Sequence, residues 1–262
     1  MPVKRIEARN FMNKSEDGSY VSNPYYGCTH HCVYCYAKYI MQAPVTSANW
    51  NNDVYVKEFS DYDIPMGTGN ARLLFSTATD PYQPLELKER ATRKILEAIV
   101  DSDLHVSILT KSKHVVRDID LFKRMKDVNI SFSIALNDDL ASIFEPGASR
   151  PSERIEALKI LHEEGIRTSV LVVPILPCFT DVFSIIDEIR GHADKVMFGG
   201  MSFKSKEHIR NFMSLIATRF PEHYETYRQI FIKKDYKYYR DLKREILAYE
   251  EKNPFNLAHI YK

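Results

Sequence analysis

Short apolar runs alternate along the chain with segments in which apolar residues recur every three to four positions. The runs are typical of strands buried on both faces, and the periodic segments are typical of helices with one apolar side. The predicted strands cover residues 21–26, 72–76, 105–110, 129–136, 167–175 and 195–199. The predicted helices cover residues 88–100, 115–125, 151–165, 182–190 and 207–220.

This order of strands and helices predicts an α/β protein whose parallel sheet is covered by helices. About six β/α units would form a partial (β/α)6 TIM-like barrel. A flat doubly wound sheet is the alternative, although no glycine-rich turn follows the first strand. Beyond Lys204 the pattern is that of helices alone. We therefore expect a barrel over residues 1–203 and a C-terminal helical extension over residues 204–262.

Composition adds few constraints. The chain has 262 residues, of which 44% are hydrophobic, so it can bury a sizeable core. The formal net charge of +1 gives no general attraction to nucleic acids or membranes. Residues 1–17 lack the apolar segment of a secretion signal, and no apolar run approaches the roughly 18 residues that span a bilayer. We expect a cytoplasmic protein with no membrane partner.

Three of the four cysteines lie within eight residues, at Cys28, Cys32 and Cys35. So tight a group in a chain without a signal segment indicates a metal or redox site rather than a disulfide framework. Thiolates hold iron–sulfur clusters, and three ligands would leave one iron of a four-iron cluster open to a chelating cofactor. A zinc site that uses His30 or His31 is the alternative, but structural zinc usually takes a second pair of ligands from a separate segment.

Tyr34, directly before the last of these cysteines, completes the pattern C-x3-C-x-Φ-C, which resembles the signature of radical S-adenosylmethionine (radical SAM) enzymes. The resemblance implies a [4Fe–4S] cluster on Cys28, Cys32 and Cys35, with S-adenosyl-L-methionine chelating the fourth iron. It also implies an external electron donor, such as flavodoxin or ferredoxin. Reduction would then release a 5′-deoxyadenosyl radical that takes a hydrogen atom from substrate.

Further segments resemble the spore photoproduct lyase-like (DNA repair photolyase-like) branch of that superfamily. They are LFSTATDPYQPLE at residues 74–86, LTKS at 109–112, SIAL at 133–136, EPG at 145–147, RPSER at 150–154 and PILP at 174–177. The resemblance implies that polar residues at successive strand ends bind S-adenosyl-L-methionine. The implied cofactor-binding residues are Tyr34, Ser76, Asp80, Lys111, Ser133 and Arg154.

One position departs from that branch. Where the spore enzyme has a cysteine that returns a hydrogen atom to the thymine radical, this chain has Thr77. A threonine O–H bond is too strong for that role, which argues against thymine-dimer repair. Cys178 and Tyr82 are the candidate catalytic residues for hydrogen return.

Residues 228–244 contain seven basic residues and two acidic ones, a net charge of +5, with interleaved tyrosines. This composition suits phosphate contact and base stacking. An amphipathic helix whose tyrosines pack on the barrel is the alternative that we favour.

These observations predict a radical SAM enzyme, lyase-like or oxidoreductase, with an unidentified substrate. A nucleic-acid related substrate is one hypothesis, and a peptide or small metabolite is another. The non-enzyme alternative is a metal-dependent nucleic-acid-binding module that uses Lys233, Lys234 and Lys237.

Overall fold

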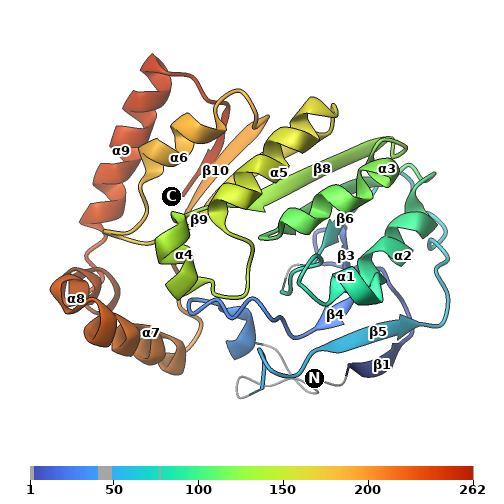
Figure 1. Cartoon of the computed structure of the whole chain (residues 1–262), viewed down its shortest axis with the longest axis horizontal. Helices are drawn as coiled ribbons and strands as arrows, with labels where there is room; N and C mark the ends of the chain where they lie inside the picture. Colours follow the sequence, from blue (N-terminus) through green and yellow to red (C-terminus); the bar gives the residue numbers. More distant parts are fainter. Residues whose placement is uncertain (1–2, 41–48, 77, 262) are drawn as a thin grey trace.

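The computed structural model describes residues 3–40, 49–76 and 78–261. Its main sheet has eight strands in the order β11-β10-β9-β8-β7-β6-β3-β2, and the neighbours from β3 to β11 are parallel (Figure 1). This mostly parallel sheet confirms the predicted α/β class and partial barrel. The strands are β2 Asn13–Lys14, β3 Tyr20–Ser22, β6 Arg72–Phe75, β7 His105–Thr110, β8 Asp127–Ser133, β9 Arg167–Ile175, β10 Lys195–Gly200 and β11 Leu257–Ile260.

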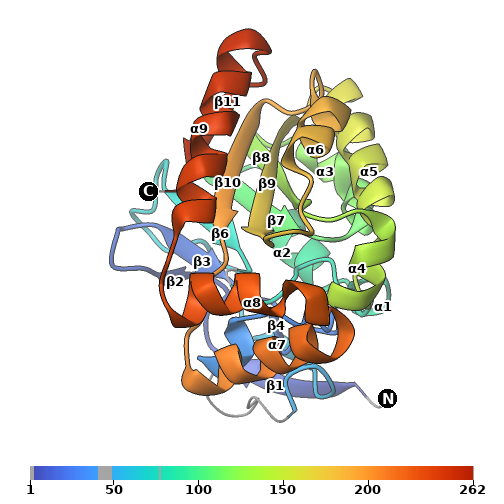
Figure 2. The ribbon, with the colours of Figure 1, turned by 90° about the vertical axis from the view of Figure 1, so that its left-hand side faces the viewer.

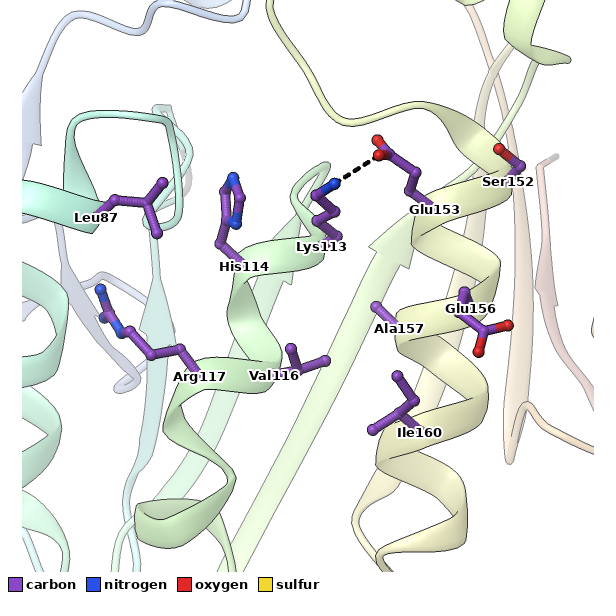
Figure 3. Close-up of a pocket in the computed structure, with 10 residues that line it drawn as sticks. All are labelled: Leu87, Lys113, His114, Val116, Arg117, Ser152, Glu153, Glu156, Ala157 and Ile160. Atoms are coloured by element: carbon purple, nitrogen blue, oxygen red, sulfur yellow. Dashed lines mark hydrogen bonds and ion pairs between the residues drawn. The ribbon is translucent and has the colours of Figure 1, made fainter.

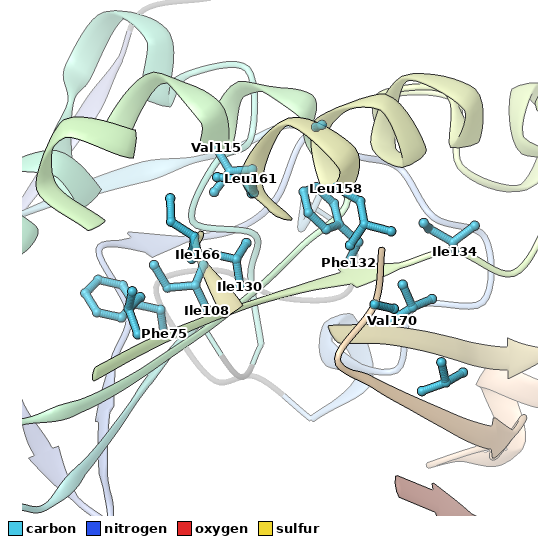
Figure 4. Close-up of a cluster of buried hydrophobic side chains, with 14 of the residues drawn as sticks. Phe75, Ile108, Val115, Ile130, Phe132, Ile134, Leu158, Leu161, Ile166 and Val170 are labelled. Carbon is cyan, nitrogen blue, oxygen red and sulfur yellow. The ribbon is translucent and has the colours of Figure 1, made fainter. Parts of the chain in front are cut away.

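Helices α2 (Ala91–Ile99), α5 (Pro151–Glu163) and α6 (Val182–Ile189) pack their apolar sides onto this sheet. Leu158 and Leu161 of α5 lie over β8 (Figure 4), and both leucine side chains are fully buried. Each fully buried apolar side chain of this size contributes about 1.5–3 kcal/mol. The core between helices and sheet therefore holds the strand ends in place.

Two predicted helices are interrupted. The segment 88–100 forms α1 (Glu86–Glu89) and α2, separated by Arg90 at φ 53°. The Glu86 carboxylate accepts the backbone N–H groups of Thr92 and Arg93 at 2.9 and 3.2 Å. It therefore caps the first turn of α2, which then begins as a separate helix. The segment 115–125 is a 3-10 helix, η2 (Lys113–Asp118), followed by α3 (Ile119–Phe122).

The predicted first strand, residues 21–26, is divided between two sheets. β3 belongs to the main sheet, whereas β4 (Tyr25–Tyr26) joins a three-stranded sheet with β5 (Tyr55–Phe59) and β1 (Lys4–Ala8). Pro24 lies between them and has no N–H to donate to a ladder. The single-strand prediction was therefore wrong beyond Ser22.

The segment after Lys204 is helical, as predicted, and then returns to the sheet. β11 extends the sheet beside β10, a short edge strand that the hydrophobic pattern did not reveal. The helices before it are α7 Lys206–Arg219, η3 Pro221–His223, α8 Tyr224–Tyr227, the π-helix η4 Arg228–Ile232 and α9 Lys237–Lys252.

Figure 2 shows α7 and α8 beneath the carboxyl ends of β9 and β10. There a second group of buried side chains joins Tyr34, Phe144 of α4 (Asp138–Phe144) and Phe212 of α7. The C-terminal helices are thus packed against the end of the barrel that carries the cysteines. Within the described residues, no helix is long and apolar enough to cross a membrane.

Candidate active site

The carboxyl ends of the parallel strands border a cavity of about 280 Å³. Part of its wall comes from the cysteine loop, which we define as residues 27–36, and part from the residues that end or follow β6, β7, β8 and β10. All three clustered cysteines line this cavity. They share it with five of the six predicted cofactor-binding residues, Tyr34, Ser76, Asp80, Lys111 and Ser133.

Two glycines allow the cysteine loop to fold tightly against its neighbours. Gly27 has φ +81°, and a Cβ atom there would lie 2.4 Å from the Asp53 carbonyl oxygen. A Cβ atom on Gly147 would lie 2.1 Å from the Thr29 carbonyl oxygen, and the Gly147 N–H donates to the His30 carbonyl at 2.9 Å. A side chain at either position would displace the loop, so the glycines set where the cysteines lie.

Burial opposes ionisation of the Cys28 and Cys32 thiols. It raises the pKa of Cys28 to about 12 and the pKa of Cys32 well above its ordinary value, while the charge of Lys111 opposes the shift at Cys32. A coordinated metal ion reverses this preference because it deprotonates the thiol outright. Free thiols on one partly buried wall are therefore a donor set that fits the irons of a cluster.

Of the two histidines of the zinc alternative, His30 lines the cavity and His31 does not. His30 is buried with its Nδ1 3.5 Å from an Asp80 carboxylate oxygen, and burial lowers its pKa to about 4. His31 is exposed at φ 56°. In the described parts of the chain, no group of three or more His, Cys, Asp or Glu side chains is placed to hold a single metal ion.

The hydroxyl groups of Ser76 and Thr79, which follow β6, are cavity-lining polar groups without a partner. Both oxygen atoms are buried and make no hydrogen bond within the described structure. A buried polar atom left unpaired costs about 1–3 kcal/mol. The pair therefore fits a polar ligand in the cavity. Thr79 was absent from the predicted site, although it lies in the same 74–86 segment as Ser76.

Asp80 also lines the cavity, but its carboxylate is already occupied. It accepts hydrogen bonds from the Thr110 hydroxyl and the Lys111 N–H, both at 2.7 Å, and from the Tyr82 N–H at 2.8 Å. These bonds join the end of β6 to the end of β7. Asp80 therefore shapes the wall that presents the Lys111 side chain.

Arg154 does not line the cavity. Its fully buried guanidinium pairs with the equally buried Glu145 carboxylate and donates to the carbonyl oxygens of Ser133 and Ser149, both at 2.8 Å. Glu145 in turn accepts the hydroxyl of Tyr34. We call Tyr34, Glu145 and Arg154 the buried network. It supports two pieces of the cavity wall, the Tyr34 ring and the end of β8, from behind.

Neither candidate for hydrogen return lies in the cavity. Tyr82 is buried in the main core, where its hydroxyl donates to Asp118 at 2.9 Å. Cys178 is exposed in a separate depression beside Tyr238. Thr77, which replaces the hydrogen-returning cysteine of the spore enzyme, lies outside the described residues.

A cavity of about 530 Å³ lies on the outside of the barrel between η2 and α5 (Figure 3). Its floor includes Val116, Ala157 and Ile160, and the Lys113–Glu153 ion pair bridges its walls. None of the three clustered cysteines lines it. Although this outer cavity has the larger volume, it lacks the thiol groups that line the cysteine cavity.

Comparison with known proteins agrees with this geometry. A model of the radical SAM superfamily matches residues 22–189. The chain therefore belongs to the radical SAM superfamily and is an enzyme of that superfamily, whose members depend on a [4Fe–4S] cluster, S-adenosyl-L-methionine and a reductant.

Among individual relatives, an uncharacterized protein of Methanocaldococcus jannaschii is 33% identical over 226 residues, 85% of each chain. A radical SAM Nalpha-GlyT isomerase of Pseudomonas phage M6 is 27% identical over 164 residues, which cover 60% of this chain and 33% of that protein.

The fold is that of spore photoproduct lyase. The structure of that enzyme with dinucleoside spore photoproduct superposes with a TM-score of 0.67 at 16% identity, over 98% of this chain and 81% of that one. Streptococcus suis SuiB bound to its precursor peptide SuiA gives a TM-score of 0.57 at 13% identity, over 92% of this chain and 48% of that one.

Proposed function

We propose that Cys28, Cys32 and Cys35 hold the [4Fe–4S] cluster and that S-adenosyl-L-methionine binds beside it in the same cavity. The observation that carries this proposal is that three free thiols and two unpaired buried hydroxyls line one cavity. When bound and given one electron by an external donor, these groups would supply a 5′-deoxyadenosyl radical, with methionine as the other product, for hydrogen abstraction from substrate. The protein positions these groups and excludes water from them.

The cavity wall offers a complementary set of groups to a zwitterionic amino acid. The Ser76 and Thr79 hydroxyls can donate to a carboxylate or accept from an ammonium group. Lys111 is the one Lys or Arg among the described lining residues, so it is our choice for the carboxylate partner. The Ser133 hydroxyl donates to the Val173 carbonyl at 2.9 Å, which leaves its oxygen available as an acceptor.

The substrate that we propose is a component of nucleic acid. Support comes from the likeness in fold to spore photoproduct lyase, which in a solved structure is complexed with dinucleoside spore photoproduct. Thr77, in place of the hydrogen-returning cysteine, favours a reaction other than thymine-dimer repair. The second candidate is a peptide, which the fold likeness to SuiB bound to its precursor peptide favours.

The test is cluster assembly and cofactor cleavage in the absence of oxygen. Wild type reconstituted with iron and sulfide should hold about four irons per chain and form 5′-deoxyadenosine when reduced. Cys28→Ser should lose both. Cys178→Ser is the matched control, since it removes a thiol outside the cavity and should retain the iron. A Cys28→Ser enzyme with full iron content and cleavage would refute the proposal.

The substrate class has its own readout. Deuterium carried into 5′-deoxyadenosine from deuterated single-stranded oligonucleotides that contain all four bases would identify hydrogen abstraction from nucleic acid. Transfer from a deuterated peptide pool alone would favour the peptide candidate and exclude the first.

A further inference from the structure

Aromatic and cationic side chains from two distant segments lie beside Tyr36, which lines the cysteine cavity. Tyr36 follows the last clustered cysteine, lines the cavity and is 40% exposed. Lys204, from the segment after β10, places its Nζ 5.9 Å from the centroid of the Tyr36 ring. Lys38 places its Nζ 4.9 Å from the ring of Tyr39. We call these four residues the mouth cluster.

Contacts with α7 hold the mouth cluster in position. The Tyr39 ring stacks on the ring of His208 with centroids 4.4 Å apart, and its hydroxyl accepts from the Asn211 side chain at 3.1 Å. Burial, together with Lys38, lowers the pKa of His208 to about 4, so this histidine is neutral at physiological pH. The positive charge of the mouth cluster therefore comes from Lys38 and Lys204, with no contribution from His208.

The two lysines of the mouth cluster differ from the basic residues of α9 in whether they form ion pairs with carboxylates. On α9, Lys237 and Arg244 both pair with Asp241, at 2.8 and 2.5 Å. In the part of the chain that the structure describes, neither Lys38 nor Lys204 forms an ion pair, and each ammonium group lies over a neutral tyrosine ring. Lys204 therefore brings uncompensated charge to a residue that lines the cavity, and Lys38 lies two positions after that residue.

We infer that Lys38 and Lys204 bind backbone phosphate of a single-stranded nucleic-acid substrate, with the Tyr36 ring as the flat surface for an adjoining base. This inference rests on the proposed function and names the residues that select its substrate. Ammonium groups attract phosphates, and bases stack on aromatic rings. Lys204 is exposed, and a cation over a ring at an exposed site is bound weakly, so this lysine can turn to a phosphate at little cost.

The experiment is fluorescence anisotropy of a labelled single-stranded oligothymidylate with the reconstituted full chain at several salt concentrations. The variants are K38Q/K204Q and K237Q/R244Q, which remove two positive charges each. Because a single-stranded phosphate contact contributes about 0.7 to the slope of log Kd against log salt, K38Q/K204Q should lower that slope by about 1.4. K237Q/R244Q should leave it near the wild-type value.

Two further measurements separate folding and function from binding. K38R/K204R keeps both charges and should restore the wild-type slope, which a folding defect would not do. The base contact is tested with Tyr36→Leu, which should raise Kd about tenfold through loss of stacking, whereas Tyr36→Phe should not.

Equal slopes for wild type and K38Q/K204Q, or a larger loss in K237Q/R244Q, would overturn the inference. Formation of 5′-deoxyadenosine without nucleic acid is measured on the same preparations. If it persists while the slopes are equal, the inference alone has failed. If cluster and cleavage are absent from wild type, the proposed function has failed, whatever the binding data show.

Discussion

The buried network behind the cavity and the charged surface of α9 are both built from basic residues paired with carboxylates, and burial separates them. Arg154 and Glu145 are fully buried, whereas the side chains of Lys237 and Arg244 beside Asp241 are 72% and 78% exposed. Water can replace a lost partner on α9 but not behind the cavity. The same residue types therefore form a scaffold in one region and a solvated face in the other.

The largest effect should follow from breaking the buried pair. Arg154→Met leaves the Glu145 carboxylate without its counter-charge, and we expect a loss of about 3–5 kcal/mol in the free energy of unfolding. Urea denaturation measures it, with Lys237→Met as the matched control on α9. A loss no larger than that of the control would contradict the difference between the buried network and the surface of α9.

Removal of a cavity-facing cation should change binding rather than stability. Lys111→Met deletes an ammonium group that lines the cavity and has no ion-pair partner within the described residues. A hydrogen bond to a charged group contributes about 1.5–3 kcal/mol, so the Kd for S-adenosyl-L-methionine should rise at least about tenfold. Equilibrium dialysis against the reconstituted enzyme tests this. An unchanged Kd would remove Lys111 from the proposed site.

Lys57 is an intermediate case, half-buried and with its Nζ 4.1 Å from the centroid of the Tyr26 ring. Burial lowers its pKa from 10.5 to about 8. Because the folded state disfavours the protonated form, the lysine destabilises the fold below pH 8, and this penalty disappears as the pH rises toward 10.5. The Tm of Lys57→Met minus that of wild type should therefore be positive at pH 7 and shrink across this window. A Tm difference that grows with pH would show that the pKa of Lys57 is not lowered in the folded state.

The smallest effect is expected on α9. Asp241→Asn removes the shared partner of Lys237 and Arg244, yet exposed pairs contribute about 0–1 kcal/mol. The free energy of unfolding should change by less than about 1 kcal/mol, measured in the same urea series. A change as large as that of Arg154→Met would show that exposure does not distinguish the two regions.

Much of the fold could be predicted because its signals are local. The strands 105–110 and 167–175 were predicted with the bounds that the structure gives them, since short segments rich in Val, Ile and Leu are typical of buried strands. The interruption at Arg90 could not be predicted in this way. It depends on the Glu86 side chain folding back onto the start of α2, which helical periodicity does not encode.

In the candidate site, too, the features with local sequence signals could be predicted, and those that depend on tertiary contacts could not. The spacing of Cys28, Cys32 and Cys35 is written in eight consecutive residues, and the sequence by itself determined the superfamily and the barrel. Only the tertiary structure decided that Lys111 lines the cavity while Arg154 supports its wall, and that Tyr82 and Cys178 lie outside it. The physical reason is that burial and pairing depend on which distant segments meet at the strand ends.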